Sequence, residues 1–226
     1  CGVLVVLATD DMPSHEIAAE ISEEPTGDEL HRAIRRFRRA QASEYAVETL
    51  LGTSAAMQKV RAQVAAAAAS YANALIRGPR GGGRAHVGRA IHYNTPDAGN
   101  LAPVDCASAA EDSLRRAIEA IRTTATPKSV STLLLLNLES LPPALHAQLA
   151  AALAATIPNV RFVATTTHDS ADVPPQISVP LSTITIDIPP LAVRPEDLPL
   201  VAQFFLEAAN RGSTKQIGVL RPEALD

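Results

Sequence analysis

The chain has 226 residues, of which 46% are hydrophobic and 19% charged, as in a globular protein with an aliphatic core. Its net charge of -4 gives no reason to expect direct DNA binding by this segment. No apolar run approaches the roughly 18 residues that a membrane-spanning helix needs. The two cysteines, Cys1 and Cys106, provide no disulfide framework. We therefore expect a cytoplasmic protein with no membrane partner, and, because it begins at Cys1, a piece of a longer chain.

The first 48 residues are predicted to lie outside the main domain. Residues 2–8 are apolar and rich in Val, which favours a strand. Residues 28–45 have apolar side chains at helical spacing, which predicts an amphipathic helix. Its basic stretch, residues 32–39, is interpreted as a solvated face rather than a DNA-binding patch. We interpret residues 1–48 as the tail of an upstream domain, with a GAF-like sensor as one candidate, followed by a helical linker.

From residue 49 onward, helical and strand patterns alternate along the chain. The predicted strands are residues 73–77, 104–106, 132–138, 160–166 and 184–188. The predicted helices are residues 55–70 (capped by Thr53 or Ser54), 84–92, 112–122, 142–155 and 195–209. Such alternation predicts an α/β fold, in which helices cover both faces of a mostly parallel sheet of about five strands.

A glycine-rich segment, GPRGGGRA, has the spacing of a Walker A phosphate-binding loop, G-x-x-x-x-G-K-[S/T]. Its glycines would allow backbone N–H groups to converge on phosphate oxygens. Arg84 stands in place of the phosphate-binding Lys, and Ala85 in place of the hydroxyl residue that contacts Mg²⁺. From the loop alone, a phosphate site and a turn without a ligand are both open. The candidate nucleotide-binding residues here are Gly78, Gly81, Gly82, Gly83, Arg84 and Ala85.

Six segments match the motifs of one family in their order along the chain. Residues 50–60 (LLGTSAAMQKV) are similar to L-[IL]-G-x-S-x-A-M-x-x-V, residues 77–92 to T-G-E-S-G-T-G-K-E-L-V-A-R-A-I-H, and residues 103–107 (PVDCA) to F-V-x-V-N-C-A-A. Residues 131–142 (STLLLLNLESLP) are similar to G-T-L-F-L-D-E-I-G-E-L-P, residues 160–167 to V-R-[VL]-I-A-A-T-N, and residues 188–200 to L-P-P-L-R-E-R-P-E-D-I-P-L. Together they resemble the AAA+ domain of bacterial sigma-54-dependent transcriptional activators, the enhancer-binding proteins.

The resemblance implies a P-loop AAA+ three-layer sandwich over residues 49–218, with a helical lid beginning at residues 219–226. It also implies ATP or ADP as the ligand, and other AAA+ subunits or a transcription regulator as partners. Leu51 and Gly52 match the family's stretch beside the adenine, and packing at the domain edge is the alternative interpretation. Arg194 is predicted to hold the start of the following helix beside the sheet rather than to act in catalysis.

The chain departs from the family at the positions that carry the chemistry. Leu136 and Asn137 match the Asp that holds Mg²⁺ and the Glu that polarises the attacking water. Leu can do neither, and Asn cannot accept a proton. Thr167 matches the Asn that senses the γ-phosphate. Glu139 is a candidate substitute base, although a solvated or helix-capping side chain is the preferred interpretation.

Two further family features are missing from the sequence. Residues 172–181, where the arginine fingers would fall, contain no Arg. Residues 107–130, where the G-A-F-T-G-A loop would contact sigma-54, contain no Gly or Phe. The sequence therefore predicts a pseudo-ATPase with no catalytic residues, no bound Mg²⁺ and no sigma-54 contact, with a regulatory or assembly role. The alternatives are an active ATPase that drives sigma-54 open-complex formation and an interaction scaffold without a ligand.

Overall fold

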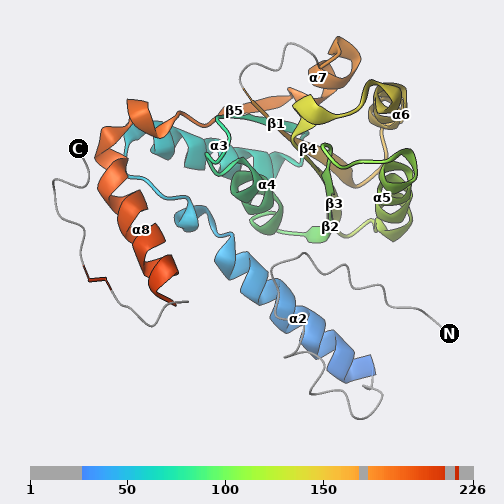
Figure 1. The fold of residues 1–226 in the computed structure, drawn as a ribbon. Helices are drawn as coiled ribbons and strands as arrows, with labels where there is room; N and C mark the ends of the chain where they lie inside the picture. The colour runs from blue at the N-terminus through green and yellow to red at the C-terminus, as the bar shows by residue number, and fades with distance from the viewer. Residues whose placement is uncertain (1–26, 168–172, 212–216, 219–226) are drawn as a thin grey trace. The chain divides into compact units, whose positions relative to one another are not determined.

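The computed structural model describes residues 27–167, 173–211 and 217–218 (Figure 1). The strand predicted for residues 2–8 and the lid predicted to begin at residue 219 lie outside the described residues. The chain divides into two units between Gln41 and Ala42. Helix α2 (Gly27–Glu44) has nearly the predicted bounds, and most of it belongs to the first unit. The predicted domain ranges 1–48, 49–218 and 219–226 stay predictions.

Five parallel strands form the centre of the second unit, in the order β2-β3-β4-β1-β5. The strands are β1 (Ala74–Arg77), β2 (Ala98–Asp105), β3 (Val130–Leu136), β4 (Val160–Thr166) and β5 (Ile184–Asp187). In β3, the side chains of Leu133, Leu134 and Leu135 are fully buried, because helices cover both faces of this interior strand. The predicted α/β fold with a five-stranded parallel sheet is confirmed.

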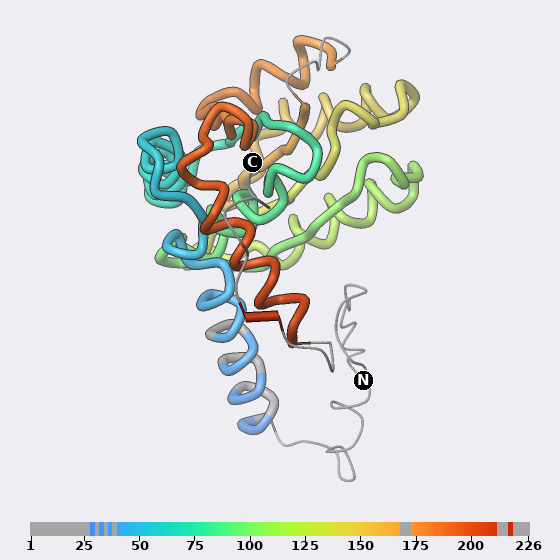
Figure 2. Tube along the Cα trace, turned by 60° about the vertical axis from the view of Figure 1, so that its left-hand side comes forward, coloured from blue at the N-terminus to red at the C-terminus, as the bar shows by residue number. Residues whose placement is uncertain are grey.

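Helices pack on both faces of the sheet (Figures 1 and 2). One face carries α3 (Ala55–Ser70) and α4 (Arg84–Tyr93), and the other α5 (Glu111–Thr124), α6 (Pro143–Ala154) and α7 (Pro175–Leu181). The first layer shares a core with Val64 and Leu134, and the second with Leu114, Leu149 and Phe162. Among the described residues, none of the helices combines the length and apolar character that a membrane span requires.

A buried arginine joins the sheet to the two helices of the first layer. Arg161 on β4 is 1% exposed and donates to the carbonyls of Ala67, in the last turn of α3, and Ile91, near the end of α4. It also donates to the hydroxyls of Thr95 and Thr132. Burial lowers the pKa of Arg161 to about 10, which leaves it protonated. A cation at two helix C-termini is stabilised by both helix dipoles.

Several predicted boundaries were wrong for local reasons. Strand β2 begins at Ala98 rather than at residue 104, which was missed because Pro103 and a glycine weaken its strand pattern. The strand tolerates a proline because β2 lies at the edge of the sheet. Strand β3 ends at Leu136, because Asn137 has a left-handed φ of 54°. The last predicted helix is a 3₁₀ turn followed by α8 (Leu198–Arg211). Helix α7 was not predicted, because its proline content argues against a helix.

Candidate nucleotide-binding site

The phosphate-loop segment connects the buried strand β1 to helix α4. Gly81 and Gly83 have φ values of 74° and 84°, which glycine adopts without strain. A Cβ at either position would meet no atom within 4 Å, so the backbone is open to a ligand there. Gly83 is the N-cap of α4, and the first N–H groups of a helix have no partner within it. These N–H groups are therefore available to bind an anion.

The other two glycines of the loop maintain its shape. The N–H of Gly82 donates to the carbonyl of Pro79 at 3.1 Å, which closes a tight turn. The N–H of Gly78 donates to Thr166 at the end of β4. A Cβ on Gly78 would lie 3.0 Å from the Ile188 Cβ and 3.5 Å from the Arg84 Cγ. The loop thus passes close to both β4 and the segment after β5.

Arg84 extends from the loop toward the end of strand β3. Its Nη1 lies 3.3 Å from Glu139 Oε1, and its Nη2 lies 3.3 Å from Asn137 Oδ1. The side chains of Arg84 and Glu139 are only 8% and 13% exposed. The preferred prediction of a solvated or capping Glu139 was therefore wrong. Glu139 lies in the 3₁₀ turn Leu138–Ser140, which directs its carboxylate at Arg84.

Asn137 connects this ion pair to the neighbouring strands. Its backbone N–H donates to Thr165 Oγ1 at 3.0 Å, and its Nδ2 donates to Asp105 Oδ1 at 3.0 Å. Asp105 ends strand β2, with its Cα opposite that of Leu136. Asp105 was not among the residues predicted for the site. One sequence signal could have found it. Asp105 matches the Asn of F-V-x-V-N-C-A-A, and Asn137 matches the Glu of the family's next motif. Relative to the family, the amide and the carboxylate have therefore changed places between the ends of β2 and β3.

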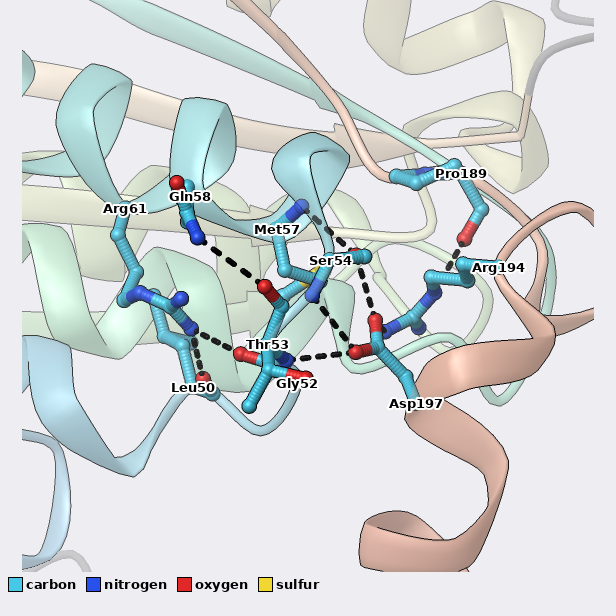
Figure 3. Close-up of polar contacts among 10 residues, drawn as sticks. All are labelled: Leu50, Gly52, Thr53, Ser54, Met57, Gln58, Arg61, Pro189, Arg194 and Asp197. Carbon is cyan, nitrogen blue, oxygen red and sulfur yellow. Dashed lines mark hydrogen bonds and ion pairs between the residues drawn. The ribbon is translucent and has the colours of Figure 1, made fainter.

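The backbone that follows Gly52 is hydrogen-bonded to a carboxylate distant in the sequence (Figure 3). Asp197, with no exposed surface, accepts from the N–H groups of Thr53 (2.6 Å) and Ser54 (2.8 Å). Its second oxygen accepts from Ser54 Oγ at 2.6 Å and from Arg194 Nη1 at 3.3 Å. Burial raises the pKa of Asp197, but these hydrogen bonds outweigh it and lower the pKa to about 2. We call these four residues the Asp197 network.

The Asp197 network determines how the chain enters helix α3. Ser54 is the N-cap predicted as one of two candidates, since its Oγ accepts from the Met57 N–H at 3.2 Å. Gly52 has a φ of 129°, and a Cβ there would lie 2.6 Å from an Asp197 oxygen. Arg194 donates to the Pro189 carbonyl as well as to Asp197, so its predicted structural role is confirmed.

Comparisons with known proteins agree on one family. The model of the sigma-54 interaction domain matches residues 51–191. The chain belongs to the sigma-54 interaction domain family. It is 26% identical over 227 residues to a Nif-specific regulatory protein of Herbaspirillum seropedicae, a match that covers 87% of this chain and 42% of that protein. The chain thus spans less than half of the length of this relative.

Solved structures place the fold among AAA+ P-loop proteins. NtrX from Brucella abortus, in complex with ADP, has a TM-score of 0.68 at 20% identity and covers 87% of this chain and 49% of its own. NtrX in complex with ATP has the same TM-score, at 86% and 51% coverage. A RuvB mutant of Thermotoga maritima has a TM-score of 0.53 at 15% identity, with 71% and 54% coverage. The predicted AAA+ fold and sigma-54-activator resemblance are therefore confirmed.

At the two positions that the family resemblance assigns to Mg²⁺ contacts, the side chains of this chain carry no oxygen atom. Mg²⁺ is bound through oxygen atoms, and neither Ala85 nor Leu136 has one in its side chain. Leu136 instead packs against the core beneath α3 and α4. In the part of the chain that the structure describes, no three His, Cys, Asp or Glu side chains could hold a metal ion together. Thr167, half-buried, directly follows β4.

Leu51 and Gly52 lie on the segment that leads into α3, and Leu51 is half-buried. The carbonyls on either side of Leu51 accept from Arg61 on α3, at 2.8 Å for Leu50 and 2.7 Å for Gly52. Packing at the domain edge, the alternative interpretation, accounts for Gly52 through its contact with Asp197. Whether the two residues also contact a base stays a prediction.

An aromatic cluster connects the segment after α2 to the phosphate-loop helix α4. The Tyr45 ring lies 4.9 Å from the His86 ring and stacks on Tyr93 at 5.4 Å. His86 Nε2 lies 2.8 Å from Thr49 Oγ1, and burial lowers the pKa of His86. The Arg89 guanidinium lies over the Tyr45 ring, 5.5 Å from its centroid, as a cation–π contact. The beginning of this domain is therefore attached to the helix that carries the phosphate loop.

Proposed function

We propose that this sigma-54-activator-like module binds ATP or ADP without hydrolysing it and serves a regulatory or assembly role in a transcription regulator. The observation that carries the proposal is the end of strand β3. Leu136 is partly buried there and packs against the apolar core, and the Asn137 amide is hydrogen-bonded to Asp105 and Arg84. Leu136 has no oxygen with which to hold Mg²⁺, and neither side chain can take a proton from water. The phosphate loop nevertheless has open backbone at Gly81 and Gly83.

ATP and ADP are the ligands to test first, because such a loop binds phosphate through backbone N–H groups. The side-chain differences from the family at Arg84 and Ala85 leave those N–H groups in place. The structural relatives from Brucella abortus were solved with ADP and with ATP. We do not expect Mg²⁺ to strengthen binding, since Ala85 and Leu136 offer it no oxygen. Without these two side-chain oxygens, the protein has no ligands of its own through which bound Mg²⁺ could raise the affinity for nucleotide.

The proposed partners are other AAA+ subunits or a transcription regulator. Residues 107–130 contain helix α5 and a short turn closed by a bridge between Thr126 and Ser129. This interval has no G-A-F-T-G-A segment. We therefore propose that the module acts without remodelling sigma-54 directly, and that any contact with DNA is made by other parts of a larger protein.

The active-ATPase alternative is favoured by one observation. Asp105 provides a carboxylate 3.0 Å from the Asn137 amide, on the strand next to the one where the family has its Glu. If Asp105 acted as the base, Mg²⁺-dependent phosphate release would be abolished by Asp105→Asn. We propose instead that Asp105 fixes Asn137, because its Oδ1 also accepts from the Ala107 N–H at 3.1 Å.

The test is a titration of the chain with a fluorescent ATP analogue, with and without Mg²⁺. We expect saturable binding that Mg²⁺ does not strengthen and that ADP competes away. Triple aspartate substitution of Gly81, Gly82 and Gly83 should abolish it, because anionic side chains would repel phosphate at the loop. Arg115→Ala on α5, an exposed arginine outside the loop, is the matched control. No binding at any concentration would contradict the proposal and leave the ligand-free scaffold.

A further inference from the structure

A carboxylate of this chain, that of Glu139, lies beside the phosphate loop. Arg84 and Glu139 form an ion pair at 3.3 Å, and both side chains are largely buried. Both also differ from the family motifs, which have Lys in place of Arg84 and Gly in place of Glu139. The two departures are 55 residues apart in sequence and meet in space.

The ion pair commits the charge of Arg84, at the start of helix α4, to an internal partner. Arg84 Nη1 faces Glu139, and Nη2 faces the Asn137 amide oxygen, so both terminal nitrogens have acceptors. Charge-assisted contacts of this kind are stronger when shielded from water. These contacts use two of the five N–H groups of the guanidinium, so a phosphate that binds Arg84 must either share its charge with Glu139 or displace that carboxylate.

Glu139 also opposes phosphate binding directly. Its second oxygen, Oε2, is buried and has no hydrogen-bond partner among the described residues. A carboxylate in that state repels an approaching anion with little screening by water. A phosphate bound beside Arg84 would therefore compete with Glu139 for the Arg84 guanidinium.

We propose that the Arg84–Glu139 ion pair is an autoinhibitory contact that keeps nucleotide affinity low, and that a nucleoside di- or triphosphate binds by displacing Glu139 from Arg84. This inference rests on the proposed nucleotide binding and names how that site is regulated. Any event that draws Glu139 away, such as movement of the turn Leu138–Ser140, raises affinity at the loop. The turn follows strand β3 and leads to helix α6, so it is placed to respond to contacts on that layer.

The test compares ADP affinity in Mg²⁺-free buffer between the wild-type chain and Glu139→Gln, measured by calorimetry. Gln keeps the size of the side chain and removes its charge, so we expect affinity to rise about tenfold or more. Glu119→Gln, at an exposed ion pair on α5, should leave affinity unchanged. Glu139→Gly, which restores the residue of the family motif, is the second variant and should also bind more tightly. Circular dichroism checks that each variant is folded.

A double-mutant cycle separates release of Arg84 from simple loss of repulsion. With Arg84→Met present, Glu139→Gln should give a smaller gain than in the wild-type background, because no cation remains to be released. Binding by the wild type with no gain in either Glu139 variant would overturn the inference and leave the proposed function standing. Binding by the Glu139 variants but not by the wild type would support the inference and contradict the proposed function of the wild-type chain. No binding by any of them would overturn the proposed function and the inference with it.

Discussion

The Asp197 network predicts a large loss of stability from a small substitution. Asp197→Asn keeps the shape of the side chain but removes a charge that accepts hydrogen bonds from Thr53, Ser54 and Arg194. The new NH₂ group would also face donors at one of the two oxygen positions. Removing one partner of a buried, hydrogen-bonded charge costs about 3–5 kcal/mol. That is a large part of the stability of about 5–15 kcal/mol that is typical of a domain.

Urea unfolding followed by circular dichroism measures this loss, since the chain has no Trp for fluorescence. Asp112→Asn, which removes an exposed carboxylate on α5, is the control and should cost at most about 1 kcal/mol. In the folded state the pKa of Asp197 is lowered from 3.8 to about 2. The charge of Asp197 therefore stabilises the fold fully above about pH 4, and this stabilisation is lost as the pH falls toward 2. The gap between wild type and Asp197→Asn should therefore narrow below about pH 4. An Asp197→Asn variant as stable as the control would refute this account.

Three further substitutions or treatments test other parts of the structure. Arg161→Met should lower the free energy of unfolding by about 3 kcal/mol, because four buried acceptors lose their donor; an unchanged urea midpoint would contradict the role given to Arg161. Gly52→Ala should cost about 2 kcal/mol or more through its φ of 129° and the contact with Asp197, and an unaltered melting temperature would argue against that constraint. Burial raises the pKa of Cys106 to about 12, so iodoacetamide should label it in urea but not in the native chain at pH 8; equal rates would show that the thiol is accessible.

The architecture of this domain could be predicted because its strands are short apolar runs separated by helical patterns. Strand β4 and helix α3 have the predicted bounds. Prediction failed where tertiary context overrides local preference. The edge position of β2 tolerates a proline, and α7 forms although Pro180 lies inside it. The end of β3 depends on a single left-handed residue, Asn137, that apolar periodicity does not indicate.

The candidate site was predictable in its positions but not in its contacts. Spacing and motif order located the phosphate loop, and they directed attention to Leu136 and Asn137 at the end of β3. The partners of Arg84 and Asn137 come from segments tens of residues away, so no local pattern reveals them. The bond between Ser54 and Asp197 joins residues 143 apart. Such pairs depend on how the strands and turns meet in space, which the fold alone determines.

The central claim is that the chain binds nucleotide and leaves it intact. The most direct measurement is a single-turnover experiment, with the chain in excess over γ-labelled ATP and Mg²⁺, in which bound nucleotide and released phosphate are followed together. Our account predicts that the bound nucleotide is recovered as ATP, with phosphate release no faster than in buffer. Phosphate release well above that background, and lost on Arg84→Ala or Asp105→Asn, would contradict it.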